Sequence, residues 1–257
     1  MSGGKVIVIT GTTSGIGSEL KRLYESRGDT VVGIARKAAP PDFAADVTDA
    51  GEMERVFSEI GNAYGRIDTV IANAGGGLSG ATELLTDEQI ENQIELNFTG
   101  ALRTVRCALR YMQKGGRVVF ISSACALFAL PFRAMYCASK SAVNMAAYGL
   151  YMELKAYGIK VCTVCPGDIK TGFTANRVKN SAGGERYGDR PAECAQKIDS
   201  REDKRMSLKS AGKKIFKCCN KCNKPLYIVG AKYKVLYFLQ RLLPTKLFLA
   251  ATLKLFG

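Results

Sequence analysis

The sequence predicts an α/β domain in which buried strands alternate with helices. Short runs of β-branched and apolar residues recur between helical patterns, and two of these runs end in glycine-rich turns. The chain has 257 residues, of which 47% are hydrophobic. This is enough for one large domain or two small ones. No internal repeat is evident beyond the alternation itself.

The first strand is predicted at residues 5–10, before the turn Gly11-Thr-Thr-Ser14-Gly15-Ile16-Gly17 and a helix at 18–27. This setting suits a phosphate, because glycines let the backbone approach closely and a helix N-terminus offers free N–H groups. The spacing is GxxxGxG, not the general GxGxxG. A merely flexible turn is the alternative.

A second strand is predicted at residues 30–34, followed by Arg36 and Lys37. Where dinucleotides bind, an acidic residue at this distance from the glycine turn holds a ribose hydroxyl, whereas an arginine suits a 2′-phosphate. Arg36 therefore favours NADP over NAD, the alternative being a solvated basic turn.

The middle of the chain continues the alternation. A helix is expected at 52–64, with Thr48 or Asp49 as its cap, and a strand at 67–72 ends in a second glycine-rich turn that starts at Asn73. Residues 87–114 look helical with a break near Asn97. An asparagine side chain competes for backbone hydrogen bonds and is unfavourable in the middle of a helix.

A strand at 117–122 precedes Ser123, and a helix at 136–157 follows. Tyr136 and Lys140 lie one helical turn apart on one face. An ammonium beside a phenol lowers the pKa of the phenol, and such a tyrosine can exchange a proton near neutral pH. The alternative is an ordinary surface pair.

The remaining elements are predicted with less periodicity to guide them. A buried strand at 159–165 ends in Pro166-Gly167, and residues 168–190 have the composition of a mobile loop. A helix begins near Arg190 and Pro191, and a last strand is expected at 226–229. Short amphipathic helices at 235–239 and 246–256 are separated by Pro244.

Composition excludes several kinds of chemistry. The chain has no histidine, which removes Ser-His-Asp and Cys-His catalysis and histidine-ligated zinc. No signal peptide or stretch of twenty apolar residues is evident, so we expect a cytoplasmic protein, with membrane association as an option. The nine cysteines are expected to be reduced thiols.

Two CxxC pairs, Cys162/Cys165 and Cys219/Cys222, raise the question of a metal site or a disulfide. The first pair lies in a predicted strand, where residues three apart face opposite sides and do not easily chelate one ion. The second pair, beside Cys218, is expected to be more open. Plain thiols are the favoured interpretation, with zinc and a redox disulfide as alternatives.

Most of the net charge of +14 lies at the C-terminus. Residues 201–257 hold 14 Lys and Arg against two acids, so they carry 14 − 2 = +12. This basic, aromatic and apolar tail suits contact with anionic lipid. A lid over a substrate pocket combined with a subunit interface is the alternative, and it is somewhat favoured. Nucleic-acid binding is not expected, because no recognised module is present.

The motifs together resemble the short-chain dehydrogenase/reductase family over essentially the whole chain. Each motif is weak alone, but all occur in family order: Thr10-Gly11-xxx-Gly15-x-Gly17, Asp46-Val47, Asn73-Ala74-Gly75, Asn97, Ser123, Tyr136-xxx-Lys140 and Pro166-Gly167. Ala72 stands where the family often has a first asparagine. The resemblance implies one doubly wound Rossmann-type domain over 1–257, a three-layer sandwich with a mostly parallel sheet of about seven strands. Residues 168–225 would form the substrate loop, and 226–257 the tail.

The resemblance also implies roles. Tyr136 would be the general acid or base, Lys140 would lower its pKa and hold the nicotinamide ribose, Ser123 would bind the substrate oxygen, and Asn97 would position a water. NADP(H) would contact the residues Gly11, Ser14, Gly15, Ile16, Gly17, Arg36, Asp46, Val47, Asn73, Ala74, Gly75, Tyr136, Lys140, Pro166, Gly167, Ile169 and Thr171.

These roles point to hydride transfer between NADP(H) and a hydrophobic ketone or secondary alcohol that is steroid-, retinoid- or lipid-like. Apolar residues suggested as pocket lining are Cys125, Leu127, Phe128, Ala129, Leu130, Phe132 and Phe173. The resemblance favours a homodimer or homotetramer. The alternatives are an NADP(H)-binding redox sensor and a zinc- or membrane-docked interaction protein, both without turnover.

Overall fold

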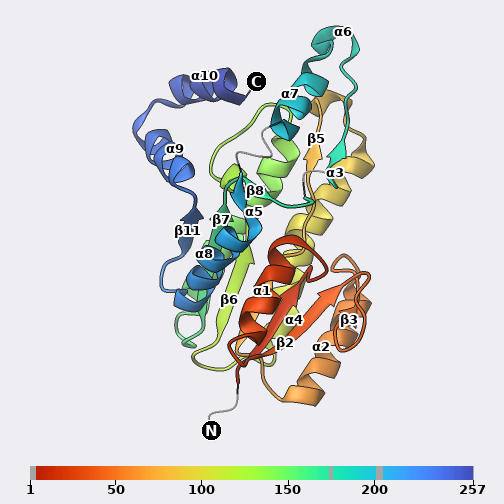
Figure 1. Cartoon of the computed structure of the whole chain (residues 1–257), viewed down its shortest axis with the longest axis vertical. Helices are drawn as coiled ribbons and strands as arrows, with labels where there is room; N and C mark the ends of the chain where they lie inside the picture. The colour runs from red at the N-terminus through yellow and green to blue at the C-terminus, as the bar shows by residue number, and fades with distance from the viewer. Residues whose placement is uncertain (1–3, 174–175, 201–204, 257) are drawn as a thin grey trace.

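A seven-stranded sheet forms the centre of the molecule in the computed structural model, which describes residues 4–173, 176–200 and 205–256 (Figure 1). Every neighbouring pair of its strands is parallel. The spatial order is β11 (Leu226–Val229), β7 (Lys160–Pro166), β6 (Arg117–Ile121), β4 (Thr69–Ala72), β1 (Val6–Thr10), β2 (Thr30–Ala35) and β3 (Phe43–Ala44). The chain adds strands outward from β1 in both directions, so the doubly wound architecture is confirmed.

Helices cover both faces of the sheet and complete the three layers (Figure 1). One face packs against α2 (Ala50–Tyr64), α4 (Gly100–Leu109) and α5 (Ala134–Glu153), and the other packs against α1 (Gly15–Glu25) and α8 (Leu208–Lys221).

Strand β1 shows why its sequence is apolar throughout. Side chains along a strand point alternately to opposite faces. Val8 therefore joins the core under α2 and α4, whereas Ile7 and Ile9 join the core under α1 and α8. Burying each such side chain contributes about 1.5–3 kcal/mol.

All six strands predicted from the sequence are present. The seventh, β3, was missed because it has only two residues, which pair with Ile34 and Ala35 at the end of β2. Of the two caps considered for α2, Asp49 is the one used: its carboxylate accepts a hydrogen bond from the Glu52 N–H at 2.8 Å.

The predicted helix break at Asn97 is confirmed as a π-helical turn. This turn, η2 (Glu95–Thr99), joins α3 (Asp87–Ile94) to α4. Such turns insert one extra residue into the helical repeat and occur often at functional sites. Here the turn directs the fully buried Asn97 side chain toward the loop after β4.

The segment 168–190 holds more regular structure than its composition indicated. Two of its strands, β8 (Ile169–Lys170) and β9 (Val178–Lys179), pair with β10 (Met206–Ser207) and β5 (Leu78–Ser79), and the segment also holds α6 (Gly184–Tyr187). Two-residue strands are too short to leave a periodic pattern, which explains the miss. Helix α7 (Arg190–Asp199) begins where Pro191 predicted it.

The C-terminal region adds helices beyond β11. The pair α9 (Ala231–Leu242) and α10 (Thr245–Phe256) flanks Pro244 as predicted, and it covers a third core cluster that includes Phe128, Tyr233 and Phe248. Short 3₁₀ turns occur at Thr82–Leu84 and Ala124–Ala126. Within the described ranges, no helix has the length and apolar character needed to cross a membrane.

Candidate active site

A cavity of about 1220 Å³ opens along the carboxyl ends of the strands. It exceeds the roughly 300–1,000 Å³ of sites that hold drug-sized molecules, so a dinucleotide and a second small molecule both have room. Its wall comes from the segments that follow β1, β2, β4, β6 and β7. Of the predicted site residues, Gly17 and Asn97 lie behind the wall and the others line it.

The glycine-rich turn after β1 is shaped by close backbone contacts. Gly11 and Gly15 have positive φ angles of 75° and 58°, which glycine adopts at little cost. A Cβ on Gly17 would lie 2.1 Å from the Gly11 carbonyl oxygen, so no larger residue fits there. Ser14 begins α1 without capping it through its own side chain. The first N–H groups of α1 therefore face the cavity and suit a phosphate.

Thr10 and Asn73 hold the two glycine-rich turns together. The Thr10 hydroxyl accepts hydrogen bonds from the N–H groups of Asn73 and Ala74, both at 3.0 Å. The Asn73 amide in turn donates to the Thr10 carbonyl at 2.9 Å. Asn73 thus acts here by fixing the loop around the cavity.

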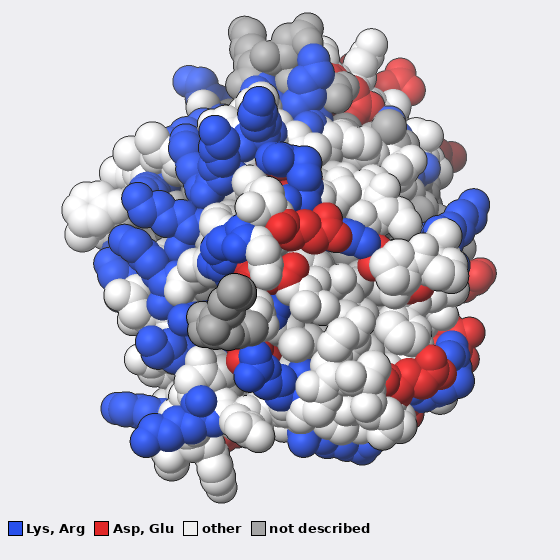
Figure 2. All heavy atoms as spheres, turned by 60° about the horizontal axis from the view of Figure 1, so that its bottom comes forward, with Lys and Arg blue, Asp and Glu red and all other residues white. Residues whose placement is uncertain are grey.

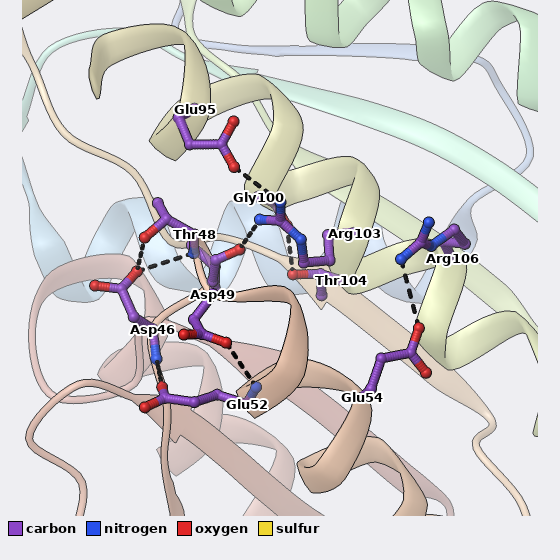
Figure 3. A network of polar contacts seen from close by, with 11 residues as sticks. Asp46, Thr48, Asp49, Glu52, Glu54, Glu95, Gly100, Arg103, Thr104 and Arg106 are labelled. Carbon is purple, nitrogen blue, oxygen red and sulfur yellow. Dashed lines mark hydrogen bonds and ion pairs between the residues drawn. The ribbon is translucent and has the colours of Figure 1, made fainter. Parts of the chain in front are cut away.

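The loop after β3 is built as a set of capping contacts (Figure 3). The Asp46 carboxylate accepts from the N–H and hydroxyl groups of Thr48 at 2.9 and 2.8 Å. Arg103 of α4 donates to the Val47 carbonyl at 2.5 Å and to Glu95 of η2 at 2.8 Å. Arg103 therefore connects the Asp46–Val47 side of the cavity to the π-helical turn.

Arg36 lies at the same end of the cavity as the Asp46–Val47 loop. Its side chain is 77% exposed, and its Nε lies 4.0 Å from the Asp46 carboxylate. An exposed ion pair at this distance is worth little, so the guanidinium is available to another anion.

Ser123 and Tyr136 lie at the opposite half of the cavity, where β6 ends and α5 begins. The Ser123 hydroxyl accepts from the Cys125 N–H at 3.1 Å. The Phe173 ring lies 5.8 Å from the Tyr136 ring, between their centroids, and it also lines the cavity. A serine hydroxyl and a tyrosine hydroxyl thus share one partly apolar space.

Lys140 and Asn97 lie just beneath this space. The Lys140 ammonium donates to the Ile121 carbonyl at 3.2 Å. The Asn97 amide oxygen accepts from the Gly76 N–H at 2.9 Å, and its nitrogen donates to the Gly76 carbonyl at 2.9 Å. A Cβ on Gly75 would lie 2.8 Å from the Asn97 oxygen and 3.2 Å from the Lys140 nitrogen. Glycine at 75 therefore makes room for both side chains.

The expected lowering of the Tyr136 pKa is wrong for this structure. Burial raises the pKa of Tyr136 above its ordinary value, and the hydrogen bond with Ser123 only partly opposes this. Lys140 is itself deeply buried, which lowers its own pKa to about 8. Its ammonium points to the Ile121 carbonyl, and no hydrogen bond joins it to the Tyr136 hydroxyl among the described contacts.

The end of β7 brings the C-terminal helices to the cavity. A Cβ on Gly167 would lie 2.0 Å from the Tyr233 ring of α9, so the ring occupies the space beside Gly167 that a larger residue would need. The Tyr233 hydroxyl donates to the Asp168 carboxylate. Tyr233 and Phe256 both line the cavity, which agrees with a lid at its substrate end.

Ile169 and Thr171 line the cavity, and Thr171 lies near the glycine-rich turn. The Thr171 methyl group would lie 3.9 Å from a Cβ on Gly15.

Among the cavity residues that the sequence analysis did not name are two arginines, and three apolar residues that it did name lie elsewhere. Arg133 and Arg177 line the cavity, but no motif marks them. Leu127, Ala129 and Phe132 do not line it, in contrast to the other suggested apolar residues. Leu127 belongs to the third core cluster, because the 3₁₀ turn before it directs its side chain inward.

The CxxC cysteines belong to the core. The expectation that the second pair is more open is wrong, since Cys219 and Cys222 are buried against the sheet together with Cys162. Burial raises the pKa of Cys219 well above its ordinary value. All nine cysteines lie in the described ranges, and all are free thiols. No group of three or more potential metal ligands comes together within those ranges.

Comparison with known proteins agrees with this geometry. The family model described as short chain dehydrogenase matches residues 5–182. A 3-ketodihydrosphingosine reductase from Bacteroides thetaiotaomicron is 33% identical over 243 residues, which cover 91% of this chain and 90% of the relative.

Two solved structures show the same fold. A short chain dehydrogenase/reductase from Burkholderia phymatum in complex with NAD has a TM-score of 0.81 and 20% identity, covering 93% of each chain. A short chain dehydrogenase from Burkholderia cenocepacia in complex with NADP has a TM-score of 0.78 and 22% identity, covering 97% of this chain and 98% of the other.

The chain belongs to the short-chain dehydrogenase family. It is therefore an oxidoreductase of the class that acts on CH–OH and C=O groups with a nicotinamide dinucleotide.

Proposed function

We propose that the protein is an NADP(H)-dependent oxidoreductase that interconverts a hydrophobic ketone and its secondary alcohol. One observation carries the proposal: Ser123, Tyr136 and Lys140 meet in the same cavity as the glycine-rich turn and Arg36. The left-handed backbone at Gly15 and the uncapped start of α1 fit a pyrophosphate. When bound, NADP(H) supplies or accepts the hydride.

In the proposed reaction the protein's own groups handle the proton and the developing charge. During reduction, the Ser123 hydroxyl donates a hydrogen bond to the carbonyl oxygen and Tyr136 donates its proton to that oxygen. The raised pKa of Tyr136 keeps the phenol protonated and ready to act as an acid. Lys140 and Asn97 hold the floor of the site through the Ile121 and Gly76 backbone.

The preference for NADP rests on Arg36. Its exposed guanidinium lies at the end of β2, close enough to the cavity wall to hold a 2′-phosphate. We expect a fluorescence titration to show tighter binding of NADPH than of NADH. Arg36→Ala should weaken NADPH binding at least about tenfold, the equivalent of about 1.4 kcal/mol. The matched control is Arg55→Ala, another exposed arginine, whose partner is Glu59 on α2.

Equal affinity for the two dinucleotides, unchanged in Arg36→Ala, would reject NADP as the preferred cofactor. Failure to bind either dinucleotide would reject the enzyme function as a whole. A panel of apolar ketones with NADPH then searches for the substrate. Rates that rise with chain length or ring number would support the hydrophobic class, because Phe128, Leu130 and Phe173 line the substrate half.

The outer face of the C-terminal helices supports a second proposal, a peripheral contact with an anionic bilayer. Phe238, Leu242 and Leu247 are each about 60% exposed. Residues 225–257 contain five Lys and Arg and no acidic residue. Two copies meeting through this face would bring like charges together, so a dimer or tetramer should use another face. Anionic lipid is complementary in both charge and apolarity.

Sedimentation with vesicles tests the bilayer contact. The protein should pellet with phosphatidylserine-containing vesicles, but not with neutral phosphatidylcholine vesicles. Leu242→Glu should abolish pelleting, whereas Tyr157→Glu, an exposed residue after α5, should not. Concentration-dependent dimers that disappear in Leu242→Glu would reject the lipid proposal and assign the face to self-association.

A further inference from the structure

Two arginines at the substrate end of the cavity have no role in the proposed reaction. Arg133 immediately precedes α5, and Arg177 immediately precedes β9. A Cβ on Gly77 would lie 3.0 Å from the Arg177 side chain and 3.2 Å from the Phe173 ring, which in turn contacts Tyr136. Both arginines line the cavity. Arg177 is thus separated from the proposed proton donor by a single side chain.

Both arginines keep an unused hydrogen-bond donor. The Nε atoms of Arg133 and Arg177 are buried and have no hydrogen-bond partner among the described residues. The Arg177 side chain is only 4% exposed. A buried donor without a partner costs about 1–3 kcal/mol, and more when the group is charged. Such donors are retained at a cavity wall when a ligand satisfies them.

The surrounding charges do not neutralise the pair. Arg177 reaches the Asp199 carboxylate at 3.3 Å, but Asp199 also pairs with Lys179 at 2.7 Å. No carboxylate within the described ranges pairs with Arg133, whose Nη1 lies 4.0 Å from the Cys125 sulfur. Burial, and after it the positive charge of Arg133, lower the pKa of Arg177.

The other ionisable groups near Arg133 and Arg177 leave the net charge around them positive. The Asp168 carboxylate accepts the hydrogen bond of Tyr233. A hydrogen bond from Cys137 lowers the pKa of Cys125, whose sulfur lies on the Nη1 side of Arg133. The Arg133 Nε is left without a partner. Arg205 also lines the cavity and adds a further guanidinium, which donates to the Ile198 carbonyl.

We propose that the substrate carries an anionic group, a carboxylate or a phosphate, which Arg133 and Arg177 bind while Ser123 and Tyr136 engage its carbonyl. This inference rests on the proposed oxidoreductase function and names its substrate class. Guanidinium groups bind both anions through charge-assisted hydrogen bonds. The cavity should correspondingly disfavour an amine-bearing substrate, because the ammonium would add another positive charge beside these arginines.

A matched series of ketones tests the inference. Each probe has a 4-oxodecyl chain that ends in a carboxylate, a phosphate ester, a methyl ester or a dimethylamino group, and kcat/KM is measured with NADPH. We expect the carboxylate or the phosphate to exceed the methyl ester at least tenfold, with the amine lowest. The ranking of the two anions identifies which one the site takes. An ester equal to both anions, or a preferred amine, would overturn the proposal.

Variants locate the effect. Arg177→Gln and Arg133→Gln, on different segments, should each reduce the anion-to-ester selectivity ratio at least tenfold. Arg186→Gln, an exposed arginine on α6 that pairs with Glu83, should leave the ratio unchanged. Thermal melting checks that each variant is folded, and two independent positions protect the test against one that is not. An unchanged ratio in both folded variants would contradict the assignment.

A binding measurement separates this inference from the reaction itself. Calorimetry with 4-oxodecanoate needs no turnover. Binding that weakens in Arg177→Gln supports the anion site even if no ketone is reduced. Reduction of neutral ketones without binding of the acid would reject the anion site alone and leave the oxidoreductase function standing.

Discussion

The two halves of the cavity are built by different means. The nucleotide half is made largely of backbone: Gly11 and Gly17 leave no space for larger side chains, Gly15 has a positive φ angle, and Asn73 fixes the turn by hydrogen bonds to the main chain. The substrate half is made of side chains that come from distant segments, among them Phe173 and Tyr233. Helices α9 and α10 lie outside the residues matched by the family model.

This difference separates what is general from what is specific. A backbone cradle at a helix N-terminus binds pyrophosphate whatever else the molecule carries. A wall of side chains determines which second molecule fits. Substitutions in the nucleotide half should therefore change dinucleotide affinity, and substitutions in the substrate half should change turnover or selectivity.

The largest difference between the effect on turnover and the effect on dinucleotide affinity is expected from Tyr136→Phe. The phenylalanine keeps the ring against Phe173 but removes the proton donor, so kcat should fall about 10²–10⁴-fold. Dinucleotide affinity, measured by fluorescence titration, should stay within about twofold, because the nucleotide half is untouched. If the protein's biological activity persisted in this variant although turnover is lost, a redox sensor would be favoured instead. Equal losses in binding and turnover would show that the halves are not independent.

Lys140 lies at the boundary between the halves, and its burial predicts a pH effect. Its pKa is lowered from 10.5 to about 8 in the folded protein, so the unfolded chain binds more protons between these values. Stability therefore rises with pH across this window, by up to about 3 kcal/mol from this one group. Denaturant unfolding should show that the unfolding free energy of the wild type, minus that of Lys140→Met, rises from pH 8 to pH 10.5.

Other groups also titrate in this range, which is why the comparison is a difference between two proteins. Lys155→Met, at an exposed lysine after α5, is the matched control and should follow the wild type at every pH. A wild-type-minus-Lys140→Met difference that stays flat with pH would mean that the buried ammonium carries no penalty.

A smaller effect is expected from Gly17→Ala in the nucleotide half. The added methyl group would lie 2.1 Å from the Gly11 carbonyl oxygen and 2.7 Å from the Asn73 amide. Relieving such overpacking typically costs about 1–3 kcal/mol of folding free energy. The displaced turn should also bind dinucleotide more weakly.

Gly149→Ala provides the control for this substitution. Gly149 lies within α5, and its nearest neighbour would be 3.7 Å from the new methyl group. Alanine should therefore stabilise the helix by up to about 1 kcal/mol. Similar melting temperatures for the two variants would contradict the claim that backbone contacts shape the nucleotide half.

The same contrast explains what the sequence could predict. Motifs with fixed spacing, such as the glycine turn and Tyr136–Lys140, could be recognised in the sequence because the constraint is local, and they line the cavity except for Gly17. Arg133 and Arg177 were missed because only the fold brings these two segments together. The α8 helix was missed because five lysines dominate its composition, and Figure 2 shows basic side chains gathered on the side where α8 lies in Figure 1. Its buried stripe, Ala211, Ile215 and Cys219 at intervals of four, was the available signal.

The Tyr136 pKa illustrates a different limit. Spacing along the helix predicted the proximity of Lys140, but the direction of the shift depends on burial of both groups, which no local pattern reports.

The smallest effect, and the sharpest test of the nucleotide half, comes from two arginines on α4 (Figure 3). Arg103 is largely buried and joins the Val47 carbonyl to Glu95, whereas Arg106 is exposed and reaches Glu54 at 3.4 Å. Arg103→Met should lower unfolding free energy by about 1–2 kcal/mol, because it leaves a carbonyl and a carboxylate without their donor. Arg106→Met should cost less than about 0.5 kcal/mol.

Dinucleotide affinity shows whether Arg103 supports the Asp46–Val47 loop specifically or only the stability of the whole fold. Arg103 holds the Asp46–Val47 loop, so its loss should weaken dinucleotide binding by less than about tenfold, under 1.4 kcal/mol, without changing selectivity among ketones. Arg106→Met should change neither. If Arg103→Met altered ketone selectivity as strongly as nucleotide affinity, the π-helical turn that carries Glu95 and Asn97 would be transmitting the change to the floor beneath Ser123 and Tyr136. The nucleotide half and the substrate half would then be energetically coupled.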